Sequence, residues 1–143
     1  VLDKKNGFWV KIEPSDKTEF DFTIDFNHPM TGEQRFRFEF STEKYMEEIS
    51  KARTFGFLKD IQYLRSQGLT LGGSLDNAIV LDDKKILNEN LRFNDEFVRH
   101  KILDAIGDMR VMGYNFIGKY TAFGGGHNLN HLLTKEIFSN SEN

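Results

Sequence analysis

Two short stretches with a phenylalanine at every second or fourth position restrict the folds open to this chain more than any other feature. In residues 19–26 and 35–40, apolar side chains alternate with polar ones, and the apolar set is Phe20, Phe22, Ile24, Phe26, Phe36, Phe38 and Phe40. A period of two places such a set on one face of a strand. Residues 27–32 join the stretches and include asparagine, proline and glycine, which are typical of turns. The pattern predicts a hairpin whose aromatic face must be covered by another layer.

Three stretches with helical spacing could supply that cover. The first follows Ser41, a favourable N-cap residue. Its apolar positions, which recur at helical intervals and should face the phenylalanines, are Tyr45, Met46, Ile49 and Ala52. A longer helix is predicted over residues 95–112, ended by Gly113, and a last helix over residues 127–138.

The remaining segments are short and punctuated by glycine. They are a strand at 53–57, a helix at 59–66, a turn at 68–73, strands at 78–81 and 85–87, and a strand at 116–123. We therefore expect an α+β fold in which residues 1–143 form a single domain. Its mainly antiparallel sheet packs on the two longer helices, and residues 53–81 form a small βαβ insert.

Composition excludes several classes of function. A length of 143 residues suits one domain, and a net charge of −3 gives no basic surface for nucleic acid or an anionic membrane. Without cysteine, a metal site must use imidazole and carboxylate groups. Of the four histidines, His28 and His131 are expected at the surface. No apolar run approaches the roughly 20 residues of a membrane span, so we expect a cytoplasmic location.

A polar stripe borders the apolar face of the helix predicted over residues 95–112. His100, Asp104 and Asp108 follow one another at intervals of four residues and therefore stack along one side. An imidazole and a carboxylate one turn apart can reach the same zinc ion, at about 2.0–2.2 Å from each ligand atom. The same spacing fits an ordinary His–Asp ion pair on a solvated flank, and spacing alone leaves both readings open.

Three glycines, residues 124–126, precede His127 at the junction between a predicted strand and the last helix. Glycines allow close approach of the backbone, and the free N–H groups of a helix start favour an anion or a developing oxyanion. If Asp108 faced His127, it could hold that imidazole charged as a general acid. A plain strand-to-helix turn with an exposed histidine is the alternative.

Two weaker patterns lie nearer the amino terminus. Asp21 and Phe22 could present a carboxylate and a ring to a nucleobase at a strand end, although alternation along a core strand explains both residues as well. Thr54 and Phe55 offer a hydroxyl and a ring directly after a helix, but a helix-to-strand junction needs no such role. Neither pattern by itself indicates a function.

Four segments together resemble the bacterial UDP-3-O-acyl-N-acetylglucosamine deacetylases. They are ARTFGF at 52–57, LGGS at 71–74, DEFVRHKILDAIGD at 95–108 and GHNLN at 126–130. The resemblance runs in order from residue 21 to about residue 133. It implies the carboxy-terminal half of a two-domain β-α-α-β sandwich enzyme. That family removes the N-acetyl group of a UDP-sugar with zinc and water, releasing acetate at the committed step of lipid A biosynthesis.

The resemblance also implies roles for individual residues. The implied zinc ligands are His100 and Asp104, and the implied catalytic residues are His127, Asp108, Thr54 and Lys101. In this set His127, held by Asp108, stabilises charge and protonates the leaving amine, while Thr54 contacts the oxyanion and Lys101 the substrate. The implied substrate contacts are Asp21 and Phe22 at the uracil, Phe55 at the sugar, Asp60 near the nucleotide, Gly126 beside His127, and Ile61, Gly73 and Ser74 in an acyl-chain passage formed by the insert.

Part of the family's active site has no counterpart in this sequence. The third zinc ligand, a histidine, and the neighbouring glutamate that acts as general base belong to the amino-terminal half of the family's enzymes. The resemblance therefore implies that residues 1–143 alone hold zinc poorly and turn over little substrate. The expected partners are that amino-terminal half and UDP-3-O-acyl-N-acetylglucosamine. A non-catalytic domain that binds UDP-sugar or acyl chains is the alternative.

Overall fold

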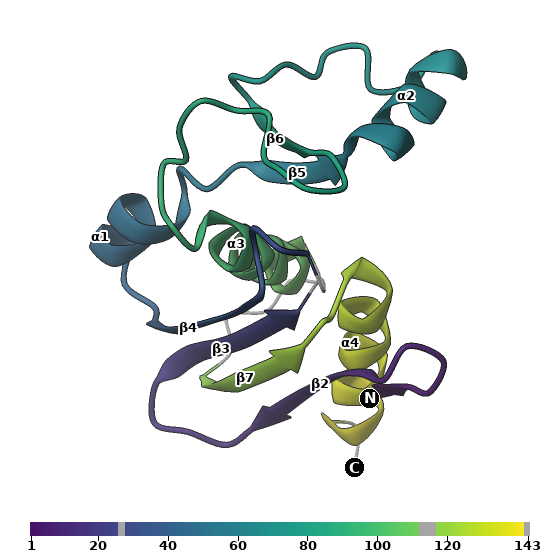
Figure 1. Cartoon of the computed structure of the whole chain (residues 1–143). Coiled ribbons are helices and arrows are strands. Elements are labelled where there is room, and N and C mark those ends of the chain that lie inside the picture. The colour runs from purple at the N-terminus through teal and green to yellow at the C-terminus, as the bar shows by residue number, and fades with distance from the viewer. Residues whose placement is uncertain (26–27, 112–116, 142–143) are drawn as a thin grey trace.

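Two helices separate a large sheet from a small two-stranded unit in the computed structural model, which describes residues 1–25, 28–111 and 117–141 (Figure 1). The large sheet consists of β1 (Leu2–Asp3), β2 (Phe8–Glu13), β3 (Thr18–Asp25), β4 (Glu33–Glu39) and β7 (Gly118–Phe123). Helices α3 (Glu96–Val111) and α4 (His127–Ser141) cover one face of it. On the far side of α3 lies the insert, built from β5 (Thr54–Phe57), α2 (Leu58–Ser66) and β6 (Ala78–Leu81).

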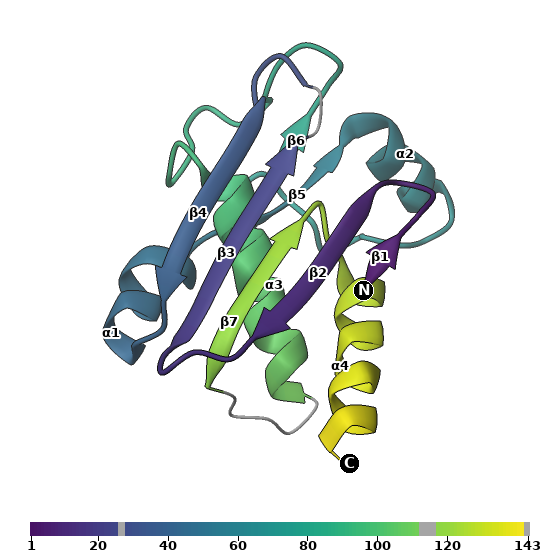
Figure 2. The same cartoon turned by 90° about the horizontal axis from the view of Figure 1, so that it is seen from below.

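The strand order of the large sheet is β1-β2-β7-β3-β4 (Figure 2). β3 pairs with β7 in parallel, and the other pairings of this sheet, within the described residues, are antiparallel. The sheet is therefore mixed rather than uniformly antiparallel, because β7 returns to its centre only after the chain has crossed over through α3. The expected α+β domain with both longer helices on one face is confirmed.

Most of the predicted aromatic face forms the centre of the core. Phe40, also predicted for this face, follows the end of β4 and is 41% exposed. Phe20, Phe22 and Ile24 of β3 are almost completely buried beside Tyr120 and Ala122 of β7. Their cover comes from the apolar side of α3, which contributes Val98, Ile102, Ala105 and Met109. Phe26, also predicted for this face, lies outside the described residues, as do Met112, Gly113 and Phe116 at the predicted element ends.

Two strand predictions need correction. The sequence patterns predict no strand before residue 19, yet β2 pairs with β7 from Trp9↔Phe123 to Glu13↔Lys119. The alternation of Phe8, Val10 and Ile12 was the signal that could have revealed it. Conversely, residues 85–87 form only an isolated bridge between Ile86 and Leu81.

Met46 points to solvent, not toward the phenylalanine face as predicted. The expected N-cap is present, since Ser41 Oγ accepts the Lys44 N–H at 3.1 Å, and α1 (Thr42–Lys44) begins there. The helix then widens into a π-helical turn, η1 (Tyr45–Ile49), in which the Ser50 N–H donates to the Tyr45 carbonyl. A wider turn shifts later residues out of a 3.6-residue period, and Met46 is 60% exposed.

His28 is buried, not at the surface as expected, with only 6% of its area exposed. Its Nδ1 accepts the Met30 N–H at 3.0 Å, so the ring proton is on Nε2, which donates to the Asp82 carbonyl at 2.7 Å. The turn between β3 and β4 is thereby attached to the end of the insert. His131 is exposed, as predicted.

The insert is a βαβ unit, as predicted, because β5 and β6 pair in parallel and α2 lies between them in sequence. A buried ion pair attaches it to α3. Glu96, at the first position of α3 and 0% exposed, accepts hydrogen bonds from the Arg53 Nε at 2.9 Å and from the main-chain N–H groups of Arg53 and Arg92. No helix among residues 1–25, 28–111 and 117–141 is long and apolar enough to cross a membrane.

The substitution Glu96→Gln should lower the free energy of unfolding by about 3 kcal/mol, because it leaves the Arg53 guanidinium buried without its counter-charge. Burial alone would raise the pKa of Glu96, but the bonds from Arg53 and Arg92 lower it overall. The stabilisation is thus present above the ordinary glutamate pKa and is lost as the pH falls through the lower folded value. Urea unfolding at several pH values measures this, with the exposed Glu89→Gln as control; equal midpoints for both variants would contradict it.

Candidate functional site

His100 and Asp104 lie one turn apart on α3, with His100 Nε2 at 3.3 Å from Asp104 Oδ1. The other ring nitrogen of His100, Nδ1, is 2.9 Å from the carbonyl oxygen of Ala52. A carbonyl oxygen can only accept, so Nδ1 carries the proton and the Nε2 lone pair of the neutral ring faces Asp104. The Ala52 carbonyl thus determines which ring nitrogen of His100 is free to bind a ligand.

This pair fits two positions of a tetrahedral zinc site. With ligand distances of about 2.0–2.2 Å, the nitrogen and oxygen ligands of tetrahedral zinc lie roughly 3.3–3.6 Å apart, which includes the 3.3 Å found here. A backbone carbonyl on the second nitrogen is also the usual support of a metal-binding histidine. Among the described residues, however, no group of three histidine, aspartate or glutamate side chains could hold a metal ion.

His127 and Asp108 form a second pair one helical turn further along. His127 Nδ1 lies 2.7 Å from Asp108 Oδ2, so the contact that the sequence only suggested is present. Asp108 Oδ2 also accepts the Asn130 Nδ2–H at 2.9 Å. The carboxylate accepts from Nδ1, and the side chain of His127 remains 70% exposed, so its Nε2 is open to a ligand.

In the glycine loop before His127, two of the glycines lie against aromatic rings that leave no room for a side chain. A Cβ on Gly124 would lie 2.1 Å from Phe8 Cδ1, and one on Gly125 would lie 2.6 Å from Phe22 Cζ. Both glycines also have positive φ angles, of 74° and 57°. Gly126 has open space beside it. A hollow of about 500 Å³ lies between this loop, the start of α4 and residues 3–8, and His127 is part of its lining.

Lys101 and Phe55 connect α3 with the insert. The Lys101 Nζ lies 6.0 Å from the centroid of the Phe55 ring, which packs edge-to-face on Phe97 at 5.1 Å. Burial lowers the pKa of Lys101, and the nearby charge of Asp104 partly opposes that change. Thr54, the first residue of β5, is exposed next to Phe55.

Asp21 and Phe22 point to opposite faces of the large sheet, and only Phe22 is on the side of the two histidine pairs. Asp21 lies on the face of β3 away from the helices, where Arg35 holds its carboxylate through two bonds of 3.0 and 2.8 Å and Arg37 approaches to 3.3 Å. The hydrogen bond from Arg35 is the main reason that the pKa of Asp21 is lowered. Phe22 is 1% exposed beneath Gly125.

The remaining predicted residues belong to the insert. Asp60 is exposed in the first turn of α2, and Ile61 packs toward Gly56, where a Cβ would lie 3.3 Å from Ile61 Cδ1. Gly73 and Ser74 lie in the loop between α2 and β6, which Arg65 attaches to α2 through a 2.9 Å bond to the Gly73 carbonyl. The large apolar side chains exposed on this unit are Tyr63, Leu69, Leu71 and Leu75.

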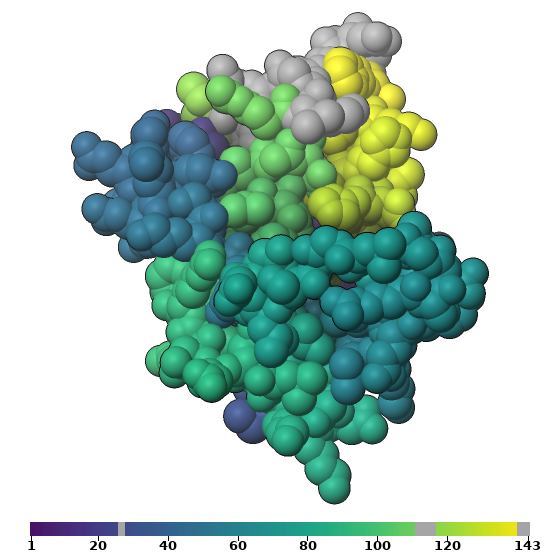
Figure 3. All heavy atoms as spheres, turned by 90° about the horizontal axis from the view of Figure 1, so that it is seen from above, coloured from purple at the N-terminus to yellow at the C-terminus, as the bar shows by residue number. Residues whose placement is uncertain are grey.

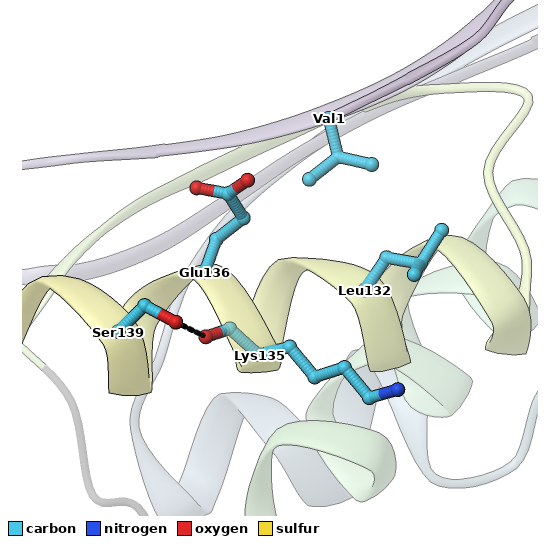
Figure 4. Close-up of a pocket in the computed structure, with 5 residues that line it drawn as sticks. All are labelled: Val1, Leu132, Lys135, Glu136 and Ser139. Carbon is cyan, nitrogen blue, oxygen red and sulfur yellow. Dashed lines mark hydrogen bonds between the residues drawn. The ribbon is translucent and has the colours of Figure 1, made fainter.

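A second hollow, of about 250 Å³, lies between the first residue and the outer side of α4 (Figure 4). Val1 and Glu136 point toward one another across it, whereas Lys135 points away along the helix. Ser139 Oγ donates to the Lys135 carbonyl at 3.0 Å. None of the predicted site residues lines this hollow.

Comparisons with known proteins agree with the pattern of these residues. The family model of UDP-3-O-acyl N-acetylglycosamine deacetylase matches residues 1–139. The chain belongs to this deacetylase family. It is 68% identical over 134 residues to the UDP-3-O-acyl-N-acetylglucosamine deacetylase of Nautilia profundicola, covering 94% of the chain and 46% of that protein. For the enzymes of that name from Helicobacter hepaticus and Sulfurimonas denitrificans, identity is 57% over 143 residues and 59% over 144, covering 99% and 100% of the chain.

The chain spans about half the length of these curated deacetylases, 46–49% of the three named, and corresponds to their carboxy-terminal half. The family resemblance described from the sequence is therefore confirmed.

Three residues around the two histidine pairs, Ala52, Tyr120 and Asn130, are not predicted from the sequence. Ala52 contributes a main-chain carbonyl, which no residue type can signal. Tyr120 donates its hydroxyl hydrogen to Asn130 Oδ1, behind Asp108. Asn130 follows His127 by three residues on the same helix, so helical spacing was the signal that could have identified it.

Replacing Lys101 with methionine should stabilise the fold by up to about 1 kcal/mol, because a half-buried ammonium is exchanged for an apolar side chain of similar length. The lowered pKa of Lys101 means that folding disfavours its charged form, so the gain is present at neutral pH and shrinks as the pH approaches the ordinary lysine value of 10.5. Urea denaturation at pH 7 and pH 10 measures it, with the exposed Lys44→Met as control. A destabilised Lys101→Met variant at pH 7 would show that the ammonium stabilises the fold.

Proposed function

We propose that this chain supplies one half of the active site of a zinc-dependent hydrolase, which removes the N-acetyl group from UDP-3-O-acyl-N-acetylglucosamine and releases acetate. Membership of the deacetylase family supports the reaction class. The observation that carries the proposal is the state of His100, whose Nδ1 is bound to the Ala52 carbonyl while Nε2 lies 3.3 Å from Asp104. This arrangement fits a pair of zinc ligands held ready for the metal.

In the complete enzyme, His100 and Asp104 would be two protein ligands, and the third would be a histidine of the amino-terminal half. When bound, zinc would polarise the amide carbonyl and make water a stronger nucleophile. The glutamate of the amino-terminal half would take up the proton of that water. The chain considered alone is therefore expected to hold zinc poorly and to be nearly inactive.

The chain's own residues would act on the charge that develops during amide hydrolysis. Thr54 would donate its hydroxyl hydrogen to the carbonyl oxygen as negative charge accumulates there. His127 binds Asp108 through Nδ1, which leaves Nε2 to deliver a proton to the departing amine nitrogen. The half-buried ammonium of Lys101 would contact the substrate on the same side of α3 as His100 and Asp104.

The two halves would form a β-α-α-β sandwich in which the second half covers the helices of this chain. Part of α3 is visible at the surface between α1 and α4, and the insert lies across one end of it (Figure 3). A partner placed there would lie over the ligand pair. In this arrangement Asp104 would be the carboxylate ligand of the zinc ion, and the general base would be the glutamate of the opposite half.

The insert would receive the acyl chain of the substrate. The hollow beside His127, which the glycine loop lines, would hold part of the nucleotide. Tyr63, Leu69, Leu71 and Leu75 supply the exposed apolar area that a hydrocarbon chain would cover. Ile61, Gly73 and Ser74 would line the passage, and Phe55 would contact the sugar. We place the reaction in the cytoplasm, at the committed step of lipid A biosynthesis.

The proposal predicts that acetate is released from UDP-3-O-acyl-N-acetylglucosamine, in the presence of zinc, only when this chain is combined with a separately expressed amino-terminal half of a family member. The reason is that neither half contains both the third ligand and the His127–Asp108 pair. His100→Ala in the assembled enzyme should lower zinc content and acetate release together, by roughly 100-fold or more for activity. The measurements are metal analysis and an acetate assay.

His131→Ala is the matched control, because it removes an exposed histidine of α4 and should leave zinc content and turnover unchanged. Normal zinc content with full activity in His100→Ala would exclude the ligand assignment. An assembled mixture that binds UDP but releases no acetate would favour a non-catalytic domain that binds the UDP-sugar.

A further inference from the structure

We propose that Tyr120 and Asn130 form a positioning relay behind Asp108, which keeps the neutral ring of His127 in the tautomer with its proton on Nδ1. The role in catalysis rests on the proposed deacetylase function, whereas the tautomer is a property of the chain itself. The relay consists of three hydrogen bonds, from Tyr120 to Asn130, from Asn130 to Asp108, and from His127 to Asp108.

The inner end of the relay is a donor with no access to water. Tyr120 is 0% exposed in the middle of β7, and its hydroxyl donates to Asn130 Oδ1. Burial is the main reason that the pKa of Tyr120 is raised, with a smaller contribution from the charge of Asp108. The hydroxyl therefore keeps its hydrogen throughout the neutral pH range and remains a donor to Asn130.

This donor determines the orientation of the Asn130 amide. Because Oδ1 accepts from Tyr120, the Nδ2 group must face the other way, and it lies 2.9 Å from Asp108 Oδ2. A flipped amide would set Oδ1 against the Asp108 carboxylate, where neither group can donate a hydrogen bond. The main chain of Asn130 is held within the helix, since its N–H donates to the Gly126 carbonyl at 3.1 Å.

Asp108 in turn receives two bonds on one oxygen, the bond from Asn130 and that from His127 Nδ1 at 2.7 Å. The side chain of His127 is mostly exposed, so packing does not fix its ring. A solvated neutral imidazole favours the tautomer with the proton on Nε2, and only the carboxylate reverses that preference here. If Asp108 lost its second bond, its carboxylate would be free to rotate away from the imidazole.

The relay would matter because Nε2 is the nitrogen of His127 that faces outward. With Nδ1 committed to Asp108, every gain or loss of a proton by the ring takes place at Nε2, where the leaving amine would be. Tyr120 and Asn130 touch neither the substrate nor the metal ligands in this arrangement. They act through Asp108 and are therefore positioning residues.

The test is ¹⁵N NMR of the 143-residue chain labelled at histidine, at a pH where His127 is neutral. The chain has four histidines, and loss of one signal set in His127→Gln assigns that residue. We expect the wild-type shifts of the Nδ1–H tautomer at His127, and a shift toward the Nε2–H tautomer in Asn130→Ala and in Tyr120→Phe. Thr134→Val is the matched control, because it removes an equally buried hydroxyl from α4 and leaves the Asn130 amide in place.

An unchanged His127 tautomer in a folded Tyr120→Phe variant would overturn the relay, even if Asn130→Ala failed to fold. In the assembled enzyme, Tyr120→Phe should lower kcat by about tenfold with little change in KM. Absence of acetate release by the wild-type assembly would contradict the proposed function, while the tautomer measurement would still decide for or against the relay.

Discussion

The buried ion pair between Arg53 and Glu96 is the contact on which the site depends. Glu96 begins α3, and Arg53 follows Ala52, whose carbonyl binds His100. Four hydrogen bonds from Arg53 and Arg92 converge on the two Glu96 carboxylate oxygens, so the buried charge is both paired and solvated by donors. One interaction thus sets the distance between the insert and the helix that carries the polar stripe.

Rigid supports and costly local features lie next to each other at this site. Three local features add little or nothing to the stability of the fold. They are the half-buried ammonium of Lys101, the mostly exposed side chain of His127, and a loop with three consecutive positive φ angles. The groups that orient the site side chains, such as the Ala52 carbonyl at His100 and the Asn130 amide at Asp108, are ones that sequence patterns do not predict. The inward-facing side chains of the β3–β7 core are almost completely buried, whereas His127 and Lys101 are only partly covered.

The parts of this structure that were predictable from sequence are those governed by local periodicity. Alternation predicts the Phe20 face of β3, helical spacing predicts the polar stripe of α3, and short segments punctuated by glycine predict the βαβ order of the insert. Contacts between distant residues had no such signal: His100 meets Ala52 across 48 positions, and His28 meets Asp82 across 54. The π-helical turn that exposes Met46 was equally hidden, because the local pattern fits an α-helix.

Both histidines of the site owe their orientation to acceptors within the chain, although the acceptors differ in kind. His100 Nδ1 binds the neutral Ala52 carbonyl, which leaves its Nε2 facing Asp104, whereas His127 Nδ1 binds the Asp108 carboxylate, which leaves its Nε2 facing outward. The two histidines, one on α3 and one at the start of α4, thus present Nε2 to different surroundings. Both orientations are therefore set by contacts within the chain itself.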